Sequence, residues 1–148
     1  MKRSAWLVLN LLVACLFLGA HFLPLYSIPD GAAATDLFSY ISAISLTSTS
    51  LAGFLIFACI GVALEIAAIV FLILAVIHGE RQFEKSDKRF GFGIVIFALA
   101  GAELALTNLG LKLNYMLFVN LAEALLAILF MFLHFRYYAF LSDRRKDQ

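Results

Sequence analysis

Charged residues are scarce in this sequence of 148 residues, of which Asp, Glu, Lys and Arg together make up 14%. Soluble domains carry about 25% charged residues, whereas this chain is 64% hydrophobic, with a mean hydropathy of +0.97. A net charge of +1 offers no basic surface to a nucleic acid, and two cysteines are too few for a disulfide scaffold. These shortages exclude a soluble globular domain, a disordered segment and a secreted disulfide-rich module.

The sequence also lacks the local motifs of known catalytic chemistries. It has no glycine-rich phosphate loop, no Cys-x-x-Cys pair and no His-Glu-x-x-His zinc pattern. No Ser, His and Asp triad stands in an evident order, and Cys15 and Cys59 both lie inside apolar runs. We therefore predict that the protein is not an enzyme.

Long apolar runs are abundant instead, and they predict four transmembrane helices. The predicted spans are residues 5–23, 51–77, 90–109 and 115–135. The predicted fold is a single all-α domain over residues 1–148, a four-helix transmembrane bundle. Residues 24–50 form a predicted outer loop that contains a short surface helix near Thr35 to Ser45, and residues 78–89 form a predicted inner loop.

The basic residues are distributed very unevenly between the two sides of the predicted bundle. Ten of the 11 Lys and Arg residues lie at the two ends of the chain or between the second and third spans, and Lys112 alone lies on the other side. Because positive loops stay in the cytoplasm, both termini are predicted to be cytoplasmic. We expect a multi-pass protein of the plasma membrane, or of the inner membrane in a bacterium.

Three glutamates interrupt the apolar spans at nearly the same depth. Glu65 lies near the middle of the second span, Glu103 just past the middle of the third, and Glu123 near the middle of the fourth. An ionisable side chain costs roughly 2.5–3.5 kcal/mol at the centre of an inserted helix, so each is a candidate functional residue.

Helical spacing places each glutamate on a face rich in small or polar residues. Asn120 lies one turn from Glu123, and Asn10 and His21 are eleven positions apart and share one face of the first span. Such small-residue faces let neighbouring helices approach closely. The predicted packing residues are Ala58, Gly61 and Ala68 in the second span and Gly93, Ala100 and Gly110 in or just after the third.

Four polar faces in a four-helix bundle meet most simply in its interior. Glu65, Glu103 and Glu123 would then gather with Asn10 and Asn120, and three adjacent buried carboxylates cannot all be ionised. The cluster would take up protons or bind a cation, with His21 on the outer approach. The structural alternative is that neutral acids only fix the helix register through hydrogen bonds worth about 0.6 kcal/mol each.

Three functional hypotheses follow from the sequence. The first is a proton- or cation-coupled channel or transporter that works as a homo-oligomer, with the bilayer around it and no cofactor other than a possible bound cation. The second is a non-catalytic accessory or assembly subunit of a larger membrane complex. The third and least favoured is an electron-transfer subunit with a b-type haem held by His78 and His134, near the inner ends of their spans.

Overall fold

The structure is a computed structural model that describes residues 2–23, 52–79, 81–109 and 115–139. Its helical elements, in chain order, are α1 (Arg3–Gly19), η1 (Ala20–Phe22), α3 (Ala52–His78), α4 (Phe83–Leu109), α5 (Tyr115–Leu133) and η3 (His134–Tyr138). Four of the helices are long and apolar enough to cross a membrane. The described part of the chain is therefore all-helical, as predicted. The predicted outer helix lies outside the described residues.

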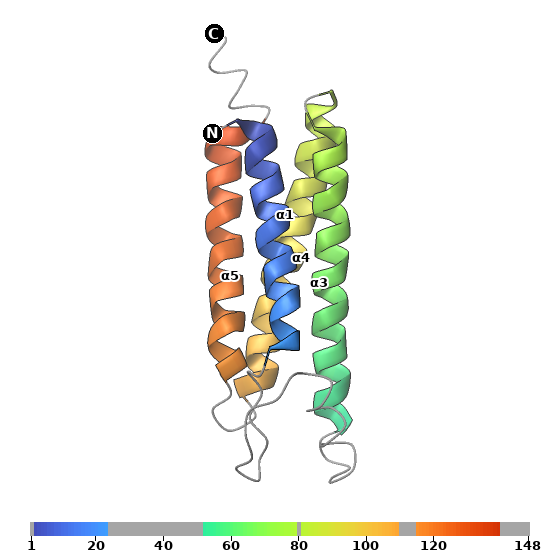
Figure 1. Ribbon diagram of the computed structural model, residues 1–148, viewed down its shortest axis with the longest axis vertical. Coiled ribbons are helices and arrows are strands. Elements are labelled where there is room, and N and C mark those ends of the chain that lie inside the picture. The colour runs from blue at the N-terminus through green and yellow to red at the C-terminus, as the bar shows by residue number, and fades with distance from the viewer. Residues whose placement is uncertain (1, 24–51, 80, 110–114, 140–148) are drawn as a thin grey trace.

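The four long helices run side by side along the long axis of the molecule (Figure 1). α4 has extensive contacts with both α3 and α5, while α1 packs mainly against α3 and has a smaller contact with α5. Arg3, Gly79 and Tyr138 meet at one end of the bundle, which we call the Arg3 end. The opposite end, toward which α1 runs, is called the His21 end.

Glycines allow α4 to approach its two neighbours closely. A Cβ atom on Gly93 would lie 3.1 Å from the main-chain oxygen of Ala68, and one on Gly101 would lie 2.8 Å from the main-chain nitrogen of Ala124. A Cβ on Gly61 would collide with the side chains of Glu103 and Leu104. Most of the predicted packing residues thus lie between helices, because Ala58, Ala68 and Ala100 are buried as well. Gly110 lies outside the described residues.

The first two turns of α4 differ from the sequence prediction. The helix begins at Phe83 and not at Phe90, so the connection from α3 is shorter than the predicted loop over residues 78–89. Ser86 and Phe90 on one face are fully buried, while Glu84, Lys85 and Lys88 on the other faces are exposed. This part of α4 is an amphipathic helix, and its charged face made it resemble a loop in the sequence.

Two local features shape the helix termini at the Arg3 end. Gly79 follows α3 with a φ of 45°, a left-handed conformation that favours glycine after a helix. The last described turn, η3, is π-helical, since the Ala139 N–H donates to the His134 carbonyl at 2.8 Å. The wider turn leaves the Tyr138 carbonyl pointing toward α1, where Arg3 binds it.

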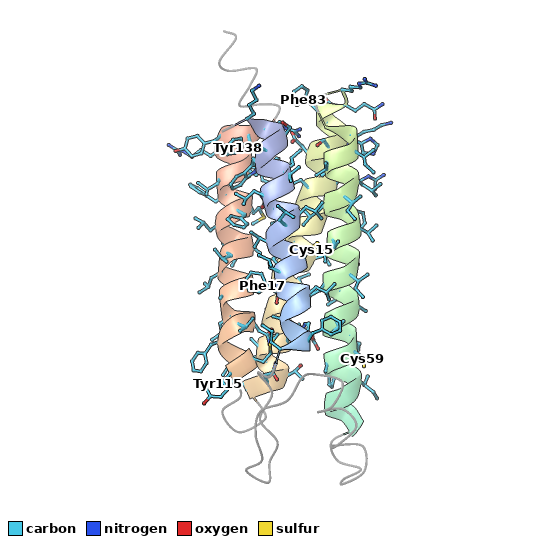
Figure 2. All side chains as sticks on the ribbon, in the orientation of Figure 1. Cys15, Phe17, Cys59, Phe83, Tyr115 and Tyr138 are labelled. Atoms are coloured by element: carbon cyan, nitrogen blue, oxygen red, sulfur yellow. The ribbon has the colours of Figure 1, made fainter. Side chains whose placement is uncertain are left out.

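The middle of the bundle is an apolar core. Leu7, Ala14, Leu72, Phe97 and Ala127 are buried there, with contributions from all four long helices. Many large apolar side chains also lie on the outside of the bundle, as do Cys15 and Cys59, which are free thiols (Figure 2). An apolar exterior is what a bilayer requires.

Candidate functional site: a buried carboxyl cluster

Each of α3, α4 and α5 contributes one glutamate to the interior, nearer the His21 end than the Arg3 end. Glu65 and Glu123 are both 0% exposed, and Glu103 is half-buried. Glu65 lies close enough to both Glu103 and Glu123 to interact with them electrostatically. We call these three residues the acidic cluster. The structure thus places on neighbouring helices the three carboxyl groups that the sequence put at one depth.

Glu65 has a direct partner in His21. The imidazole Nε2 lies 3.0 Å from Oε1 and 3.1 Å from Oε2 of Glu65, and the histidine is only 2% exposed. The short helix η1 places this ring, because it extends α1 by one turn beyond Gly19. The sequence placed His21 on the outer approach to the acids, whereas the structure places it in contact with one of them. A proton can pass between Nε2 and the carboxylate without a bridging group.

Glu123 faces Glu65 in the interior, closely enough for the two carboxyl groups to share a proton. Apart from this approach to Glu65, neither of its oxygens has a well-aligned hydrogen-bond partner among the described residues, and its Cγ packs over Gly101 of α4. Asn120, one turn away on α5, is also 0% exposed, and its side-chain nitrogen and oxygen have no partner within the described ranges either. Buried polar groups in proteins are nearly always satisfied. These two side chains therefore mark a place where a proton, a water molecule or an ion can bind.

Glu103 is more accessible than the other two glutamates and lies over Gly61 of α3. The Thr107 hydroxyl donates to the Glu103 main-chain carbonyl at 2.8 Å and lies 3.3 Å from Oε1 of its side chain. The second side-chain oxygen, Oε2, is buried without a partner among the described residues. The glycine at position 61 is thus what makes room for this carboxyl group between the two helices.

Asn10 lies apart from the acidic cluster. Eleven residues separate it from His21, which at the helical rise is about 16 Å along α1. Its side-chain nitrogen donates to the Trp6 carbonyl at 2.8 Å. Asn10 therefore makes no hydrogen bond to the glutamates with which the sequence grouped it, because a shared helix face does not imply a shared depth. Asn108, which the sequence analysis did not single out, is buried and donates to the Leu104 carbonyl at 3.0 Å.

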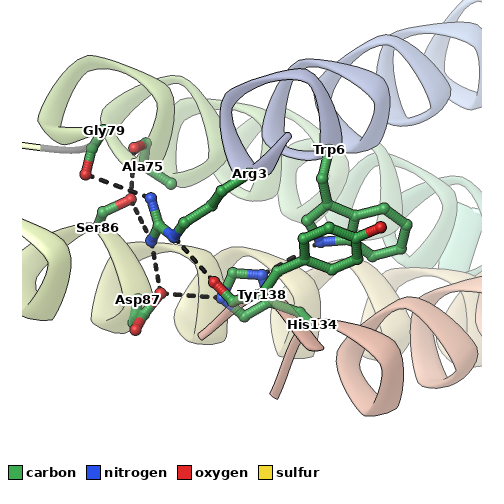
Figure 3. Close-up of polar contacts among 8 residues, drawn as sticks. All are labelled: Arg3, Trp6, Ala75, Gly79, Ser86, Asp87, His134 and Tyr138. Carbon is green, nitrogen blue, oxygen red and sulfur yellow. Dashed lines mark hydrogen bonds and ion pairs between the residues drawn. The ribbon is translucent and has the colours of Figure 1, made fainter. Parts of the chain in front are cut away.

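A second buried polar network lies at the Arg3 end (Figure 3). Arg3 and His21 are 18 residues apart, which is roughly 27 Å along α1 at the helical rise. Arg3 is 7% exposed and forms an ion pair with Asp87, with Nη2 2.6 Å from Oδ1. The same guanidinium donates to the Tyr138 carbonyl at 2.9 Å, the Gly79 carbonyl at 3.2 Å and the Ser86 hydroxyl at 3.0 Å. Arg3 thus connects α1 with all three other long helices or their ends. We call this group the Arg3 network.

His134 occupies the α5 side of the Arg3 network. The Trp6 indole N–H donates to Nδ1 at 3.2 Å, while Nε2 lies 3.0 Å from Oδ1 of Asp87. Because an indole nitrogen can only donate, Nδ1 accepts and the ring proton sits on Nε2, facing the carboxylate. Both nitrogens are therefore occupied, and a haem held by His78 and His134 would have to break one of these hydrogen bonds.

The sequence did not predict the Arg3 network, because each of its residues was interpreted for a different local property. Arg3 counted only as one of the charges that orient the protein, Trp6 lay within the first predicted span, and Asp87 lay within the predicted inner loop. Trp6 in fact stacks on Tyr138 with ring centroids 4.7 Å apart, and His134 stacks on Phe90 at 3.8 Å. The burial of Ser86, whose hydroxyl donates to the Ala75 carbonyl at 2.7 Å, was equally invisible in the sequence.

Geometry and comparison give no further identification of the site. Within the described residues, no group of three or more His, Cys, Asp or Glu side chains is arranged to hold a metal ion. Comparison with protein families, with curated proteins and with solved structures found no match to this chain.

Proposed function

We propose that this multi-pass membrane protein is a proton- or cation-coupled channel or transporter in which the acidic cluster carries the ion. One observation supports this proposal above all. The carboxyl groups of Glu123 and Glu65 are both fully buried and face each other, and Glu123 has no other hydrogen-bond partner among the described residues. Fixing the helix register does not need two facing buried acids, because an amide or a hydroxyl would fix the helices at a smaller cost.

The chemistry of the cluster supports ion uptake. Neighbouring carboxylates in a water-poor interior repel one another, so their charge must be neutralised by protons or by a cation. His21 offers a route for protons, because its Nε2 contacts both oxygens of Glu65 and can exchange a proton with them. Glu65 then connects His21 with Glu123, and Asn120 supplies a further oxygen and a donor beside Glu123.

The lengths of the helices favour access from the His21 end. α1 and η1 end at Phe22, one residue after His21, which contacts Glu65. α3 continues beyond the end of α1 (Figure 1) and begins 13 residues before Glu65, about 20 Å from it along the helix. On the other side of the cluster lies the apolar core, with Ala14, Phe97 and Ala127. Ions that enter from the His21 end therefore need a rearrangement of this core, or a path shared with a second copy, to cross.

The location and orientation of the protein belong to the same proposal. The Lys and Arg residues that the structure describes all lie toward the Arg3 end, which we therefore place in the cytoplasm, with the His21 end outside. The membrane is then the plasma membrane, and the functional unit is a homo-oligomer, since four helices seldom enclose an aqueous path by themselves.

A second candidate function is that of a non-catalytic accessory subunit in a larger membrane complex. The observation in its favour is the apolar core, which separates the acidic cluster from the Arg3 network in the described part of the bundle. In that case a group from a partner protein would supply the hydrogen bonds that Glu123 does not make to Glu65.

Ion flux through proteoliposomes tests the proposal. Glu123→Gln keeps the shape of the side chain but removes its charge, so it should leave the protein folded, with a loss of stability below about 1 kcal/mol. It should reduce proton or cation flux at least tenfold, as should Glu65→Gln. The matched control is Glu84→Gln, which removes an exposed carboxylate from α4 outside the cluster and should leave the flux unchanged.

Thermal stability in detergent provides the second arm of this test. A cation that binds the cluster should stabilise the wild-type protein in proportion to its concentration, and should not stabilise Glu123→Gln. Protons compete for the same oxygens, so this stabilisation should weaken as the pH falls. A wild-type protein with no flux and no dependence of stability on cations or pH would exclude transport and favour the accessory subunit.

A further inference from the structure

An apolar groove lies between α4 and α5 near the Arg3 end and has a volume of about 480 Å³. Its apolar lining consists of Gly91, Phe92, Val95, Met131 and Phe135. Gly91 has no side chain to fill the groove. A Cβ atom there would point into free space, with only the ring of Phe135 within 4 Å, at 3.5 Å. The groove follows α4 from Asp87 and Lys88 at its mouth to Val95, about 10 Å deeper into the bundle.

A basic hollow of about 370 Å³ adjoins this groove and shares Lys88 and Phe92 with it. Its other lining residues are His78, Lys85 and Arg89. Side chains with nitrogen tips project from the bundle at this end, where Phe83 lies (Figure 2). The Arg89 guanidinium lies 6.0 Å from the centre of the Phe71 ring, which places this cation on the α3 side of the hollow.

Within the described residues, none of the basic residues of the hollow forms an ion pair with an acid, and Glu84, one turn from Lys88 on α4, is exposed to solvent. Among the described residues, the ion pairs of this region are those of Asp87 with Arg3 and with His134. Asp87 is therefore already neutralised from within the bundle, although it also lines the groove. Lys85, Lys88 and Arg89 have no carboxylate partner in the described ranges, so three positive charges face outward beside an apolar slot.

We propose that this surface binds one anionic phospholipid. Its phosphate would lie in the basic hollow against Lys85, Lys88 and Arg89, and an acyl chain would lie in the apolar groove. The two parts meet at Lys88 and Phe92, as the headgroup and the chain of one lipid do. Basic pockets between transmembrane helices bind anionic headgroups in this way, and each Lys or Arg near an anionic surface contributes roughly a fivefold gain in affinity.

Native mass spectrometry of the full-length protein in detergent tests the site directly. Dioleoylphosphatidylglycerol should bind the wild-type protein at least tenfold more tightly than dioleoylphosphatidylcholine. The variant with Lys85→Gln, Lys88→Gln and Arg89→Gln should lose at least tenfold in affinity for the anionic lipid. The matched control replaces three basic residues of the same end outside the hollow, with Lys2→Gln, Arg81→Gln and Arg136→Gln, and should retain the preference.

Two further measurements separate a lipid from a soluble anion. Gly91→Leu adds a side chain in the groove without changing any charge, and it should displace the lipid while leaving the melting temperature within a few degrees of wild type. Inorganic phosphate at millimolar concentration should not compete with the lipid.

Four outcomes would each overturn the assignment of a lipid to this site. The two lipids could bind equally well, or the triple variant of Lys85, Lys88 and Arg89 could lose no more affinity than its control. The Gly91→Leu variant could bind the lipid fully, or phosphate could compete with the lipid. If the triple variant does not fold, two measurements still test the lipid site: the binding of the two lipids to the wild-type protein, and the binding of the anionic lipid to Gly91→Leu.

Discussion

Replacing Arg3 tests the structure most directly, because the sequence and the structure assign this residue different roles. As an orienting charge in water, Arg3 would contribute almost nothing to stability once the protein is inserted. In the structure, its guanidinium donates four hydrogen bonds, one of them to the Asp87 carboxylate at 2.6 Å. Arg3→Met should therefore destabilise the purified protein substantially.

The size of the effect follows from what the variant leaves behind. Ser86 keeps its bond to the Ala75 carbonyl, and Asp87 keeps its contact with His134, but Asp87 loses its ionic partner. Breaking one side of a buried ion pair costs 3–5 kcal/mol, and the remaining 14% exposure of Asp87 favours the lower end. We expect a loss of about 3 kcal/mol in the free energy of unfolding, with Arg3→Lys between this variant and wild type, because an ammonium cannot reproduce the planar fork.

Equilibrium unfolding in mixed micelles would measure these differences. Arg81→Met, which removes an exposed arginine from the same end, is the control and should change stability by less than about 0.5 kcal/mol. Combining Arg3→Met with Asp87→Asn should cost less than the sum of the two single changes, since each alone removes the same ion pair. If Arg3→Met matched Arg81→Met, or if the double variant were additive, the Arg3 network would be wrong.

Three shorter predictions concern helix contacts and orientation. Gly101→Ala should destabilise the bundle by about 1–3 kcal/mol, because the new Cβ would lie 2.8 Å from the α5 backbone, while the control Gly91→Ala should be nearly neutral. Equal stabilities of the two variants would refute the close contact between α4 and α5. Trp6→Phe keeps a ring to stack on Tyr138 but loses the N–H donated to His134, so unfolding should cost about 1 kcal/mol less, and a change near zero would argue against that hydrogen bond. In a variant without other cysteines, Gln82→Cys should react with an impermeant thiol reagent only from the cytoplasmic side, and labelling from outside would reverse the proposed orientation.

The number and approximate bounds of the long helices followed from the sequence alone. A span is a local property, because about 20 consecutive apolar residues satisfy the bilayer wherever their neighbours lie. The start of α4 was missed because hydropathy along the sequence averages the two faces of a helix. The exposed Lys85 and Lys88 lower this average and hide the buried Ser86 and Phe90. The depth of Glu65, Glu103 and Glu123 was likewise readable, because depth depends only on the position of a residue along its span.

Only the tertiary structure decided which polar groups meet. The contact between His21 and Glu65 joins residues 44 positions apart, and the bond from Arg3 to Tyr138 joins residues 135 positions apart. Periodicity gives the face of a helix but not which neighbour that face meets. For this reason Asn10 was grouped with the acids, although it lies about 16 Å along α1 from His21, the α1 residue that contacts Glu65. The contacts themselves depend on how closely the helices approach, which Gly61 and Gly101 determine, and on the π-helical turn that aims the Tyr138 carbonyl at Arg3.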